Sequence, residues 1–353
     1  MVRTWNRITA NWYLTIGGAI ILLLILTSLI GPFIAPDKSP MANEMNIELA
    51  NQRPGFSIYQ WLISTKSGET QRIFSNNYEW HKDTLIIYPY LGENEIPIIK
   101  ETFLLENLQF EHTTIGSAAK EQVERQFKDK KRFILGSDRY GRDVLSRLIG
   151  GARISLSVGI MAVVISLIIG TILGLLAGYY RGWIDELISW FINVIWSLPA
   201  LLLVIAISFV LGKGYWQVFI AVGLSMWVEV ARIVRGQVLS LREKEYIEAG
   251  KALGFSDLRI ITKHILPNSI TPILVVATSN FAAAILLEAG LSFLGFGAQP
   301  PMPSWGNMIK EHYGYIVVGS AYLAILPGLA IMICVFAFNM ISIGFRDFVT
   351  NED

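Results

Sequence analysis

The chain has 353 residues, a formal net charge of +1 at pH 7, and 53% hydrophobic against only 16% charged residues. A soluble globular domain carries about a quarter charged residues, so this composition excludes an ordinary soluble protein and indicates a membrane protein. The net charge says nothing about nucleic acid, but no long basic run is present, so no nucleic-acid partner is expected. A single cysteine, Cys334, excludes a disulfide framework and a thiolate metal site.

Stretches free of Asp, Glu, Lys and Arg predict the membrane spans, because a helix needs roughly 20 apolar residues to cross a bilayer. One further stretch, 214–228, is the fourth in chain order and is short, so it crosses the bilayer only if its helix continues past Glu229 toward Ala231. The stretch 289–309 is rich in helix-breaking Gly and Pro, so we expect an ordered loop there. The first stretch is too long for a cleaved signal peptide and predicts an uncleaved anchor. The five long stretches are 8–36, 154–180, 187–212, 264–287 and 312–345.

Positive charge in the short loops predicts how the spans are oriented. With the N-terminus in the cytoplasm, the inner segments hold 11 Lys and Arg, whereas the short outer segments hold only Lys213 and Lys310. The sequence therefore predicts an all-α polytopic membrane protein with six transmembrane helices in an N-in/C-in orientation. Residues 37–135 are then an extracytoplasmic insertion between the first and second helices.

The insertion is long enough to fold by itself. It contains stretches rich in β-forming residues near Tyr88 and a helix-like stretch at 117–133, which together predict a small α+β domain. Trp80, Tyr88 and Tyr90 belong either to a surface for a receptor or solute or to the domain core, and the core is the favoured interpretation. His81 and His112 lack a metal-ligand spacing, so no metal site is expected.

The segment EAGKALGFSDLRIITKHILP, residues 248–267, is a short charged module between the fourth and fifth spans. Gly254 offers the left-handed conformation that ends a helix, and Ser256 can cap a second helix with Asp257 in its first turn. We expect Pro267 to break this helix before the fifth span. These residues alone equally support a linker and a docking element. The predicted apolar face of the second helix consists of Leu258, Ile261 and Ile265.

This module resembles the EAA loop of ABC-transporter permease subunits, which forms a coupling helix that docks on the ATPase subunit. Gly250 stands where Ala is usual, and His264 at its place is typical of the dipeptide/oligopeptide branch. Two further runs, 136–159 and 288–309, are similar to that branch, so the resemblance covers about 136–348. It is strongest with the C-type permease of these importers. The resemblance implies an ATPase-coupling loop made of Glu248, Ala249, Gly250, Gly254, Asp257, His264, Leu266 and Pro267.

The family implies a pore-forming permease subunit of an ATP-driven importer in the cytoplasmic (inner) membrane. Its expected partners are a second, B-type permease, two ATP-binding cassette ATPase subunits and an extracytoplasmic solute-binding protein. No catalytic residue, metal or cofactor is expected in this chain, because the ATPases bind ATP and Mg. Consistent with that, the sequence has no phosphate-binding loop. A peptide-like solute is favoured, although the branch also moves nickel, glutathione and other solutes.

The same resemblance divides the chain into four parts. These are a cytoplasmic N-terminus with an anchor helix at 1–36, the insertion at 37–135, a permease core at 136–348 and a cytoplasmic tail at 349–353. The coupling loop lies at 229–267 within the core. Two other functions are weighed against this one. A membrane receptor sensing through 37–135 has no need of the Gly254 module, and an intramembrane enzyme lacks paired catalytic groups.

Pro199 and Glu288 are candidate gate or pathway residues. Pro199 predicts a kink in the third span, which suits a gate. Glu288 closes the fifth span, where a pathway role and interfacial anchoring are equally supported. Asp185 begins the third span, and the helix dipole accounts for it. In the second span, Gly170 and Gly174, like Gly174 and Gly178, have the G-x-x-x-G spacing of close helix packing, which we expect within the subunit.

Overall fold

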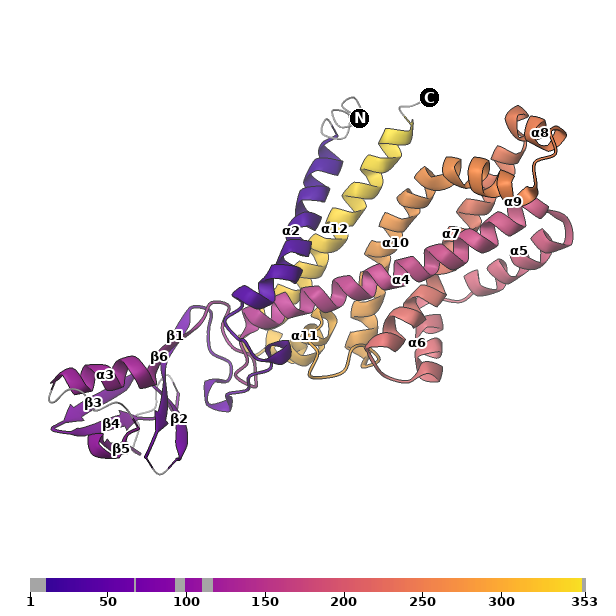
Figure 1. Ribbon diagram of the computed structural model, residues 1–353. Coiled ribbons are helices and arrows are strands. Elements are labelled where there is room, and N and C mark those ends of the chain that lie inside the picture. The colour runs from indigo at the N-terminus through magenta and orange to yellow at the C-terminus, as the bar shows by residue number, and fades with distance from the viewer. Residues whose placement is uncertain (1–10, 67, 93–98, 110–116, 351–353) are drawn as a thin grey trace. The chain divides into compact units, whose positions relative to one another are not determined.

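The computed structural model describes residues 11–66, 68–92, 99–109 and 117–350 (Figure 1). The chain forms two compact units. Residues 34–147 make an α+β unit, and residues 1–33 with 148–353 make a helical unit.

The α+β unit contains two three-stranded antiparallel sheets, with strand orders β2-β1-β6 and β3-β4-β5. Alternate residues of β1 and β4 point inward, as a pleated strand requires, and bury Trp61, Ile63, Leu85 and Ile87 against α3. The elements are β1 Phe56–Ser64, β2 Thr70–Ser75, β3 Asn77–His81, β4 Thr84–Tyr88, β5 Glu101–Leu104, α3 Ser117–Phe127 and β6 Lys128–Phe133.

The helix expected at 117–133 is wrong in its second half. It ends at Phe127, and residues 128–133 form β6, which pairs with β1 from Phe56 opposite Phe133 to Trp61 opposite Lys128. Pairing with β1 overrides the local helix propensity of this lysine-rich stretch, and Phe133 is buried as a result. The core role favoured for Trp80 is confirmed, because its ring packs on this core. His112 lies outside the described residues.

Glu124 of α3 joins the helix to the sheets. Its carboxylate accepts hydrogen bonds of 2.9 Å from the Tyr78 hydroxyl and from the Trp80 indole N–H. The ammonium of Lys128 lies 3.5 Å from the same carboxylate and 4.2 Å from the ring centre of Tyr59. Burial raises the pKa of Glu124, but the two aromatic donors and the charge of Lys128 outweigh burial and lower the pKa overall. This network therefore stabilises the unit at neutral pH and is lost as the pH falls through the lowered pKa.

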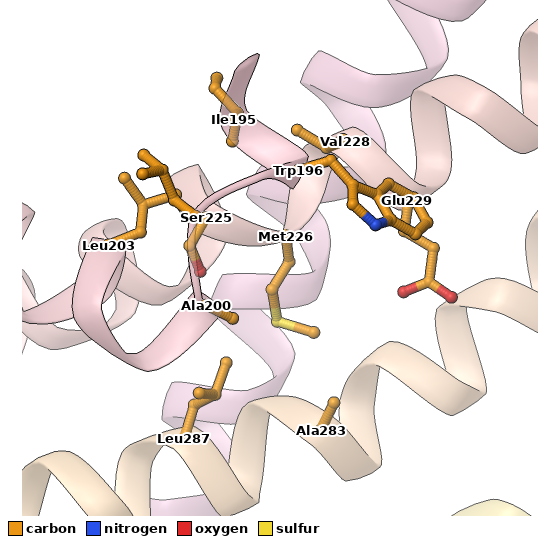
Figure 2. Close-up of a pocket in the computed structure, with 11 residues that line it drawn as sticks. Ile195, Trp196, Ala200, Leu203, Ser225, Met226, Val228, Glu229, Ala283 and Leu287 are labelled. Carbon is orange, nitrogen blue, oxygen red and sulfur yellow. The ribbon is translucent and has the colours of Figure 1, made fainter. Parts of the chain in front are cut away.

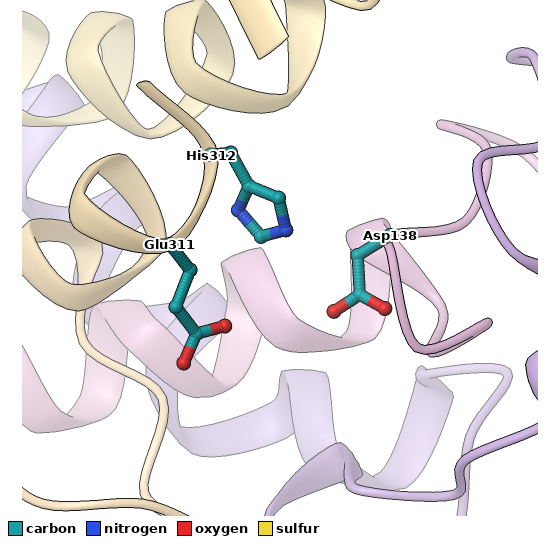
Figure 3. Close-up of side chains that lie close together, drawn as sticks. All are labelled: Asp138, Glu311 and His312. Carbon is teal, nitrogen blue, oxygen red and sulfur yellow. The ribbon is translucent and has the colours of Figure 1, made fainter. Parts of the chain in front are cut away.

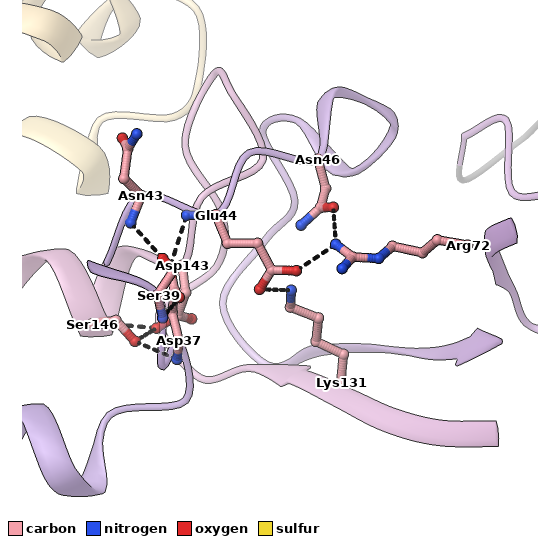
Figure 4. A network of polar contacts seen from close by, with 9 residues as sticks. All are labelled: Asp37, Ser39, Asn43, Glu44, Asn46, Arg72, Lys131, Asp143 and Ser146. Carbon is pink, nitrogen blue, oxygen red and sulfur yellow. Dashed lines mark hydrogen bonds and ion pairs between the residues drawn. The ribbon is translucent and has the colours of Figure 1, made fainter. Parts of the chain in front are cut away.

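A polar network joins residues 37–44 to β2 and β6 (Figure 4). The Glu44 carboxylate binds the Arg72 guanidinium at 2.7 Å and the Lys131 ammonium at 2.8 Å. Asp37 accepts hydrogen bonds from the backbone N–H groups of Ser39 and Glu44. The ion pairs of Glu44 join segments far apart in the sequence, so they stabilise the fold of this unit.

The helical unit is a bundle of long apolar helices. Five of the described helices are long and apolar enough to cross a membrane, and a sixth span is reached if the bent pair α5–α6 counts as one. This is a mostly helical polytopic membrane fold. The helices are α2 Trp12–Ile34, α4 Val144–Tyr180, α5 Gly182–Trp196, α6 Ala200–Leu211, α7 Tyr215–Arg242, α8 Glu245–Ala252, α9 Asp257–Ile260, α10 Leu266–Leu294, α11 Trp305–His312 and α12 Tyr322–Thr350.

Several expected span boundaries differ from the structure. The third span is broken rather than kinked at Pro199, because α5 and α6 meet at 96°. The expected loop at 289–309 is shorter, since α10 continues to Leu294, where Gly295 with φ +92° ends it. Ser304 then caps α11, whose last residue is His312 (Figure 3). His312 is buried, and its Nδ1 lies 2.8 Å from the Met308 carbonyl. The continuation of the fourth span past Glu229 is confirmed, because α7 ends at Arg242.

The glycines of α4 lie against α7, which confirms the expected packing within the subunit. A Cβ added to Gly174 would lie 2.6 Å from the Ala231 carbonyl oxygen and 2.7 Å from the Val234 Cβ. Gly170 and Gly178 meet α7 valines in the same way, one turn before and one turn after. Only glycine permits this backbone approach, and in a membrane such contact replaces the hydrophobic effect as the source of helix association.

We predict that Gly174→Ala destabilises the helical unit by about 1–3 kcal/mol, because the added methyl group must push α4 away from α7. Gly236→Ala on α7 is the matched control, since a Cβ there meets nothing within 4 Å. It should be neutral or stabilise by up to about 1 kcal/mol through helix propensity. Thermal unfolding of the detergent-solubilised chain, followed by tryptophan fluorescence, measures both. Equal melting temperatures for the two variants would contradict the packing argument.

Candidate functional site

The module after α7 is a helix, a tight turn and a second helix. Gly254 has φ +75°, and its N–H donates to the Lys251 carbonyl at 2.9 Å, while the Phe255 N–H donates to the Gly250 carbonyl at 3.0 Å. This is the Schellman pattern, in which a left-handed residue satisfies the last carbonyls of a helix. The predicted turn at Gly254 is therefore present, and it ends α8. Ser256 precedes α9 as expected, although its side chain makes no capping hydrogen bond.

The inner face of this module is part of the bundle. Ile247 of α8 and Ile260 and Ile265 of the second helix are almost completely buried, and they share one cluster with Val234 and Val238 of α7. The same cluster includes residues of α4 and α10. Because close-packed side chains transmit displacement, a movement of α8 or α9 is passed to the ends of three long helices.

Polar contacts add to this packing. The Tyr179 hydroxyl at the end of α4 donates to the Asp257 carboxylate at 2.6 Å. The Lys251 ammonium lies 5.3 Å from the centre of the Tyr179 ring, and the Arg242 guanidinium donates to the Tyr179 carbonyl. Of the expected coupling residues, Asp257 lies in the first turn of α9 as expected, and it is also bound to α4.

The outer face of the module is exposed and partly apolar. Leu253 is 74% exposed and Leu258 is 71% exposed, and both lie beside the Gly254 turn. Glu248 and Ala249 are also exposed on α8. Leu258 was expected on the buried face with Ile261 and Ile265, and that expectation is wrong. The short α9 instead turns Ile260 inward, so that Leu258 is left on the surface.

The expected break at Pro267 is also wrong. A π-helical turn at Ile261–Ile265 joins α9 to α10, and the helix continues from Asp257 to Leu294. Pro267 follows this turn as the second residue of α10 and does not end the helix. The wider turn places His264 on Phe255, with their rings stacked 6.1 Å apart. A Cβ on Gly250 would lie 3.3 Å from the Phe255 ring, so an alanine at this position would need a small shift of that ring.

A second feature is a cavity of about 340 Å³ beside the break at Pro199 (Figure 2). Residues from α5, α6, α7 and α10 line it, and Leu198 and Ala200 flank Pro199 on its wall. The side chains are apolar apart from Ser225, the indole N–H of Trp196 and one charged group, Glu229. The lining residues are Ile195, Trp196, Leu198, Ala200, Leu203, Ser225, Met226, Val228, Glu229, Ala283 and Leu287.

Glu288, the other candidate pathway residue, is not on this wall. It is 1% exposed, and its carboxylate accepts hydrogen bonds from Ser292 at 2.7 Å and from Ser155 at 3.2 Å. The expectation that Glu288 closes the fifth span is wrong, because α10 continues six residues beyond it, to Leu294. Its contacts connect α10 to α4.

An ion pair between α5 and α7 escaped the sequence analysis. The Asp185 carboxylate binds the Arg235 guanidinium through two contacts of 2.5 and 2.8 Å, and Ser189 also donates to it. The helix dipole is therefore an incomplete account of Asp185. The available signal was one acid and one base near the same ends of two consecutive predicted spans, and only the structure shows that these ends meet.

We predict that Asp185→Asn destabilises the chain by about 1–3 kcal/mol, because it leaves the half-buried Arg235 without its charged partner. Glu243→Gln, which breaks the exposed pair between Glu243 and Arg181, is the matched control and should change stability by less than about 0.5 kcal/mol. Melting temperatures in detergent compare the two. An Asp185→Asn variant as stable as Glu243→Gln would show that the pair between the helices contributes nothing.

Two family models match the chain. The family described as "Binding-protein-dependent transport system inner membrane component" matches residues 170–351, which is half of the chain. The family described as "N-terminal TM domain of oligopeptide transport permease C" matches residues 1–54. The first match contains the module, the cavity and the α10–α12 region.

Named relatives agree with these families. The dipeptide transport system permease protein DppC of Alkalihalophilus pseudofirmus is 48% identical over 212 residues, which are 60% of this chain and 69% of that protein. The glutathione transport system permease protein GsiD of Escherichia coli is 45% identical over 60% of this chain and 70% of that protein. A solved inward-facing structure of the MetNI methionine ABC transporter has 20% identity and a TM-score of 0.46, and the match covers 56% of this chain and 96% of that one.

The family models and the sequence relatives carry the assignment. They leave the receptor alternative without support, and they make the chain a transport component rather than an enzyme. The chain belongs to the binding-protein-dependent transport system inner membrane components, as a C-type permease subunit of the peptide ABC importers.

Proposed function

We propose that this permease imports a peptide-like solute across the cytoplasmic membrane. A dipeptide permease and a glutathione permease are similar to it at 48% and 45% identity, and both of those solutes carry peptide bonds. In the assembly we propose, it works beside a B-type permease, two ATP-binding cassette ATPase subunits and an extracytoplasmic solute-binding protein. ATP and Mg bind to the ATPases, and this chain supplies no cofactor site.

The proposed topology has six spans with both termini in the cytoplasm. It counts α5 and α6 as one broken span, and the excess of Lys and Arg in the inner segments supports it. Residues 37–135 are then extracytoplasmic, which suits their separate α+β fold. The anchor at 1–36, the core at 136–348 and the tail at 349–353 complete this proposed division.

In this topology the Gly254 module faces the cytoplasm and is the surface for an ATPase subunit. The observation that carries this proposal is its two-sided construction. Three buried isoleucines join it to the long helices, while Leu253 and Leu258 stay exposed beside a rigid turn. A linker needs no exposed apolar face. The proposed coupling residues are Glu248, Ala249, Gly250, Gly254, Asp257, His264, Leu266 and Pro267.

The proposed cycle follows from that construction. ATP binding draws the ATPases together and displaces α8 and α9, and the shared cluster passes this displacement to α4, α7 and α10. ATP can drive the change only by binding one of the two arrangements of the helices more tightly than the other. Pro199 serves as the gate hinge, because the break beside it lets α6 move with little change in α5. Glu288 contributes by holding α10, which forms one wall of the cavity, against α4.

We predict that Gly254→Val abolishes coupled transport while membrane insertion remains normal. A β-branched residue at φ +75° costs roughly 1–2 kcal/mol or more, so the turn changes shape and its two exposed leucines move. Gly254→Asn is the matched control, because Asn tolerates the left-handed conformation and nothing lies within 4 Å of an added Cβ. It should keep most of the transport.

A mild-detergent pull-down of the tagged chain from its own membrane measures this coupling. The wild type and Gly254→Asn should recover a second permease and two ATPases that contain phosphate-binding loops, whereas Gly254→Val should lose the ATPases. Uptake by the same cells reports transport. Normal uptake and full ATPase recovery by Gly254→Val would refute the coupling role of the module.

A further inference from the structure

Glu229 is an acid in the middle of a spanning helix. It lies 14 residues after Tyr215, the first residue of α7, and 13 before Arg242, the last, so it is about 20 Å from either end. Its side chain is exposed in the subunit, although its helix neighbours Val228 and Val230 are buried. Glu229 directly follows the apolar stretch 214–228 and precedes the arginines of α7, and acids on membrane-spanning helices mark solute or ion pathways.

Two other acids of the spanning helices have partners of a kind that Glu229 lacks. Asp185 is bound to Arg235, and Glu288 accepts hydrogen bonds from two serines. Within the described part of the chain, no hydrogen bond or ion pair involves the Glu229 carboxylate. The nearest cation along α7, Arg232, instead has its guanidinium 3.4 Å from the centre of the Trp196 ring. The internal contacts of the subunit therefore give no structural reason for this acid.

The carboxylate opens into the cavity beside Pro199. Figure 2 shows it extending from α7 toward α10, the helix that carries Ala283 and Leu287. Glu229 is the one charged residue among those that line this cavity, and the other walls are almost entirely apolar. An apolar cavity with one fixed negative charge favours a ligand that carries a positive charge. The apolar walls discriminate little between the side chains of such a ligand.

We propose that the Glu229 carboxylate binds the ammonium group of the solute as it passes through the permease. For a peptide, this is the amino terminus. The group is present whatever the side chains are, and its three N–H donors can be accepted by the two carboxylate oxygens. The attraction between two charges is stronger beside apolar walls than in bulk water, and a solute without the positive charge does not gain it. This inference rests on the proposed function, because it takes the cavity to be part of the transport pathway.

The first test measures the charge that the cavity presents. The complete transporter is purified with Cys334→Ala, which removes the one native thiol of this chain, and with Ala283→Cys as a reporter on the α10 wall, and labelling is followed on this chain alone. The rates at which a cationic and an anionic methanethiosulfonate reagent modify the thiol at position 283 are compared. Glu229→Gln should lower the cation-to-anion rate ratio about tenfold. Glu186→Gln, which removes an exposed acid outside the cavity, should leave that ratio unchanged.

An unchanged ratio in Glu229→Gln would overturn the proposal, and so would a reporter thiol that neither reagent reaches. The second test is protection of the same thiol by trialanine and by N-acetyl-trialanine. Protection by trialanine alone, lost in Glu229→Gln, is the expected result. Protection by both peptides, or by neither, would contradict binding through the ammonium group. Failure of the wider proposal is visible separately, because ATPase subunits would then be absent from the purified complex.

Discussion

The contact between α4 and α7 is the constraint on which the helical unit depends. Three glycines spaced one turn apart let the two backbones approach to a distance that no side chain permits. Because lipid offers apolar groups no gain from burial against one another, this close packing is what holds α7 inside the bundle. The position of α7 then places the other functional parts. Its middle carries Glu229 on the cavity wall, Arg235 fixes α5, and its end at Arg242 leads into the module.

The helix α7 contributes both to the cluster under the module and to the wall of the cavity. The module is seated on the ends of α4, α7 and α10, and the cavity is lined from α5, α6, α7 and α10. In the proposed cycle, a displacement of α8 and α9 reaches the cavity through α7 and α10. The break at Pro199 supplies the complementary element, because α6 is joined to α5 only by a short turn at 96°. In this account, the part of the cavity wall formed by α7 and α10 moves with the module, while α6 can rotate about the break at Pro199.

The sequence predicts most of the spans and the Gly254 turn, because apolar length and a left-handed glycine are local properties. It fails where a distant partner decides. Residues 128–133 become a strand only because β1 pairs with them, and the pairing of Asp185 with Arg235 depends on which helix ends meet. The π-helical turn before Pro267 likewise cannot be predicted from composition. The helix continues through this turn and past the proline that was expected to break it. The role of Glu229 could not be separated from that of a loop acid until α7 was seen to continue to Arg242.

The most direct measurement of the central claim is site-specific photo-crosslinking from the module in native membranes. A photoreactive phenylalanine replaces Leu253, and a second variant carries it at Val317, an equally apolar residue that is 91% exposed elsewhere in the helical unit. The account predicts an adduct between position 253 and an ATPase subunit, weakened or shifted when ATP is added, and no such adduct from position 317. No ATPase adduct at position 253, or equal adducts at both positions, would contradict the claim that this module couples the permease to ATP.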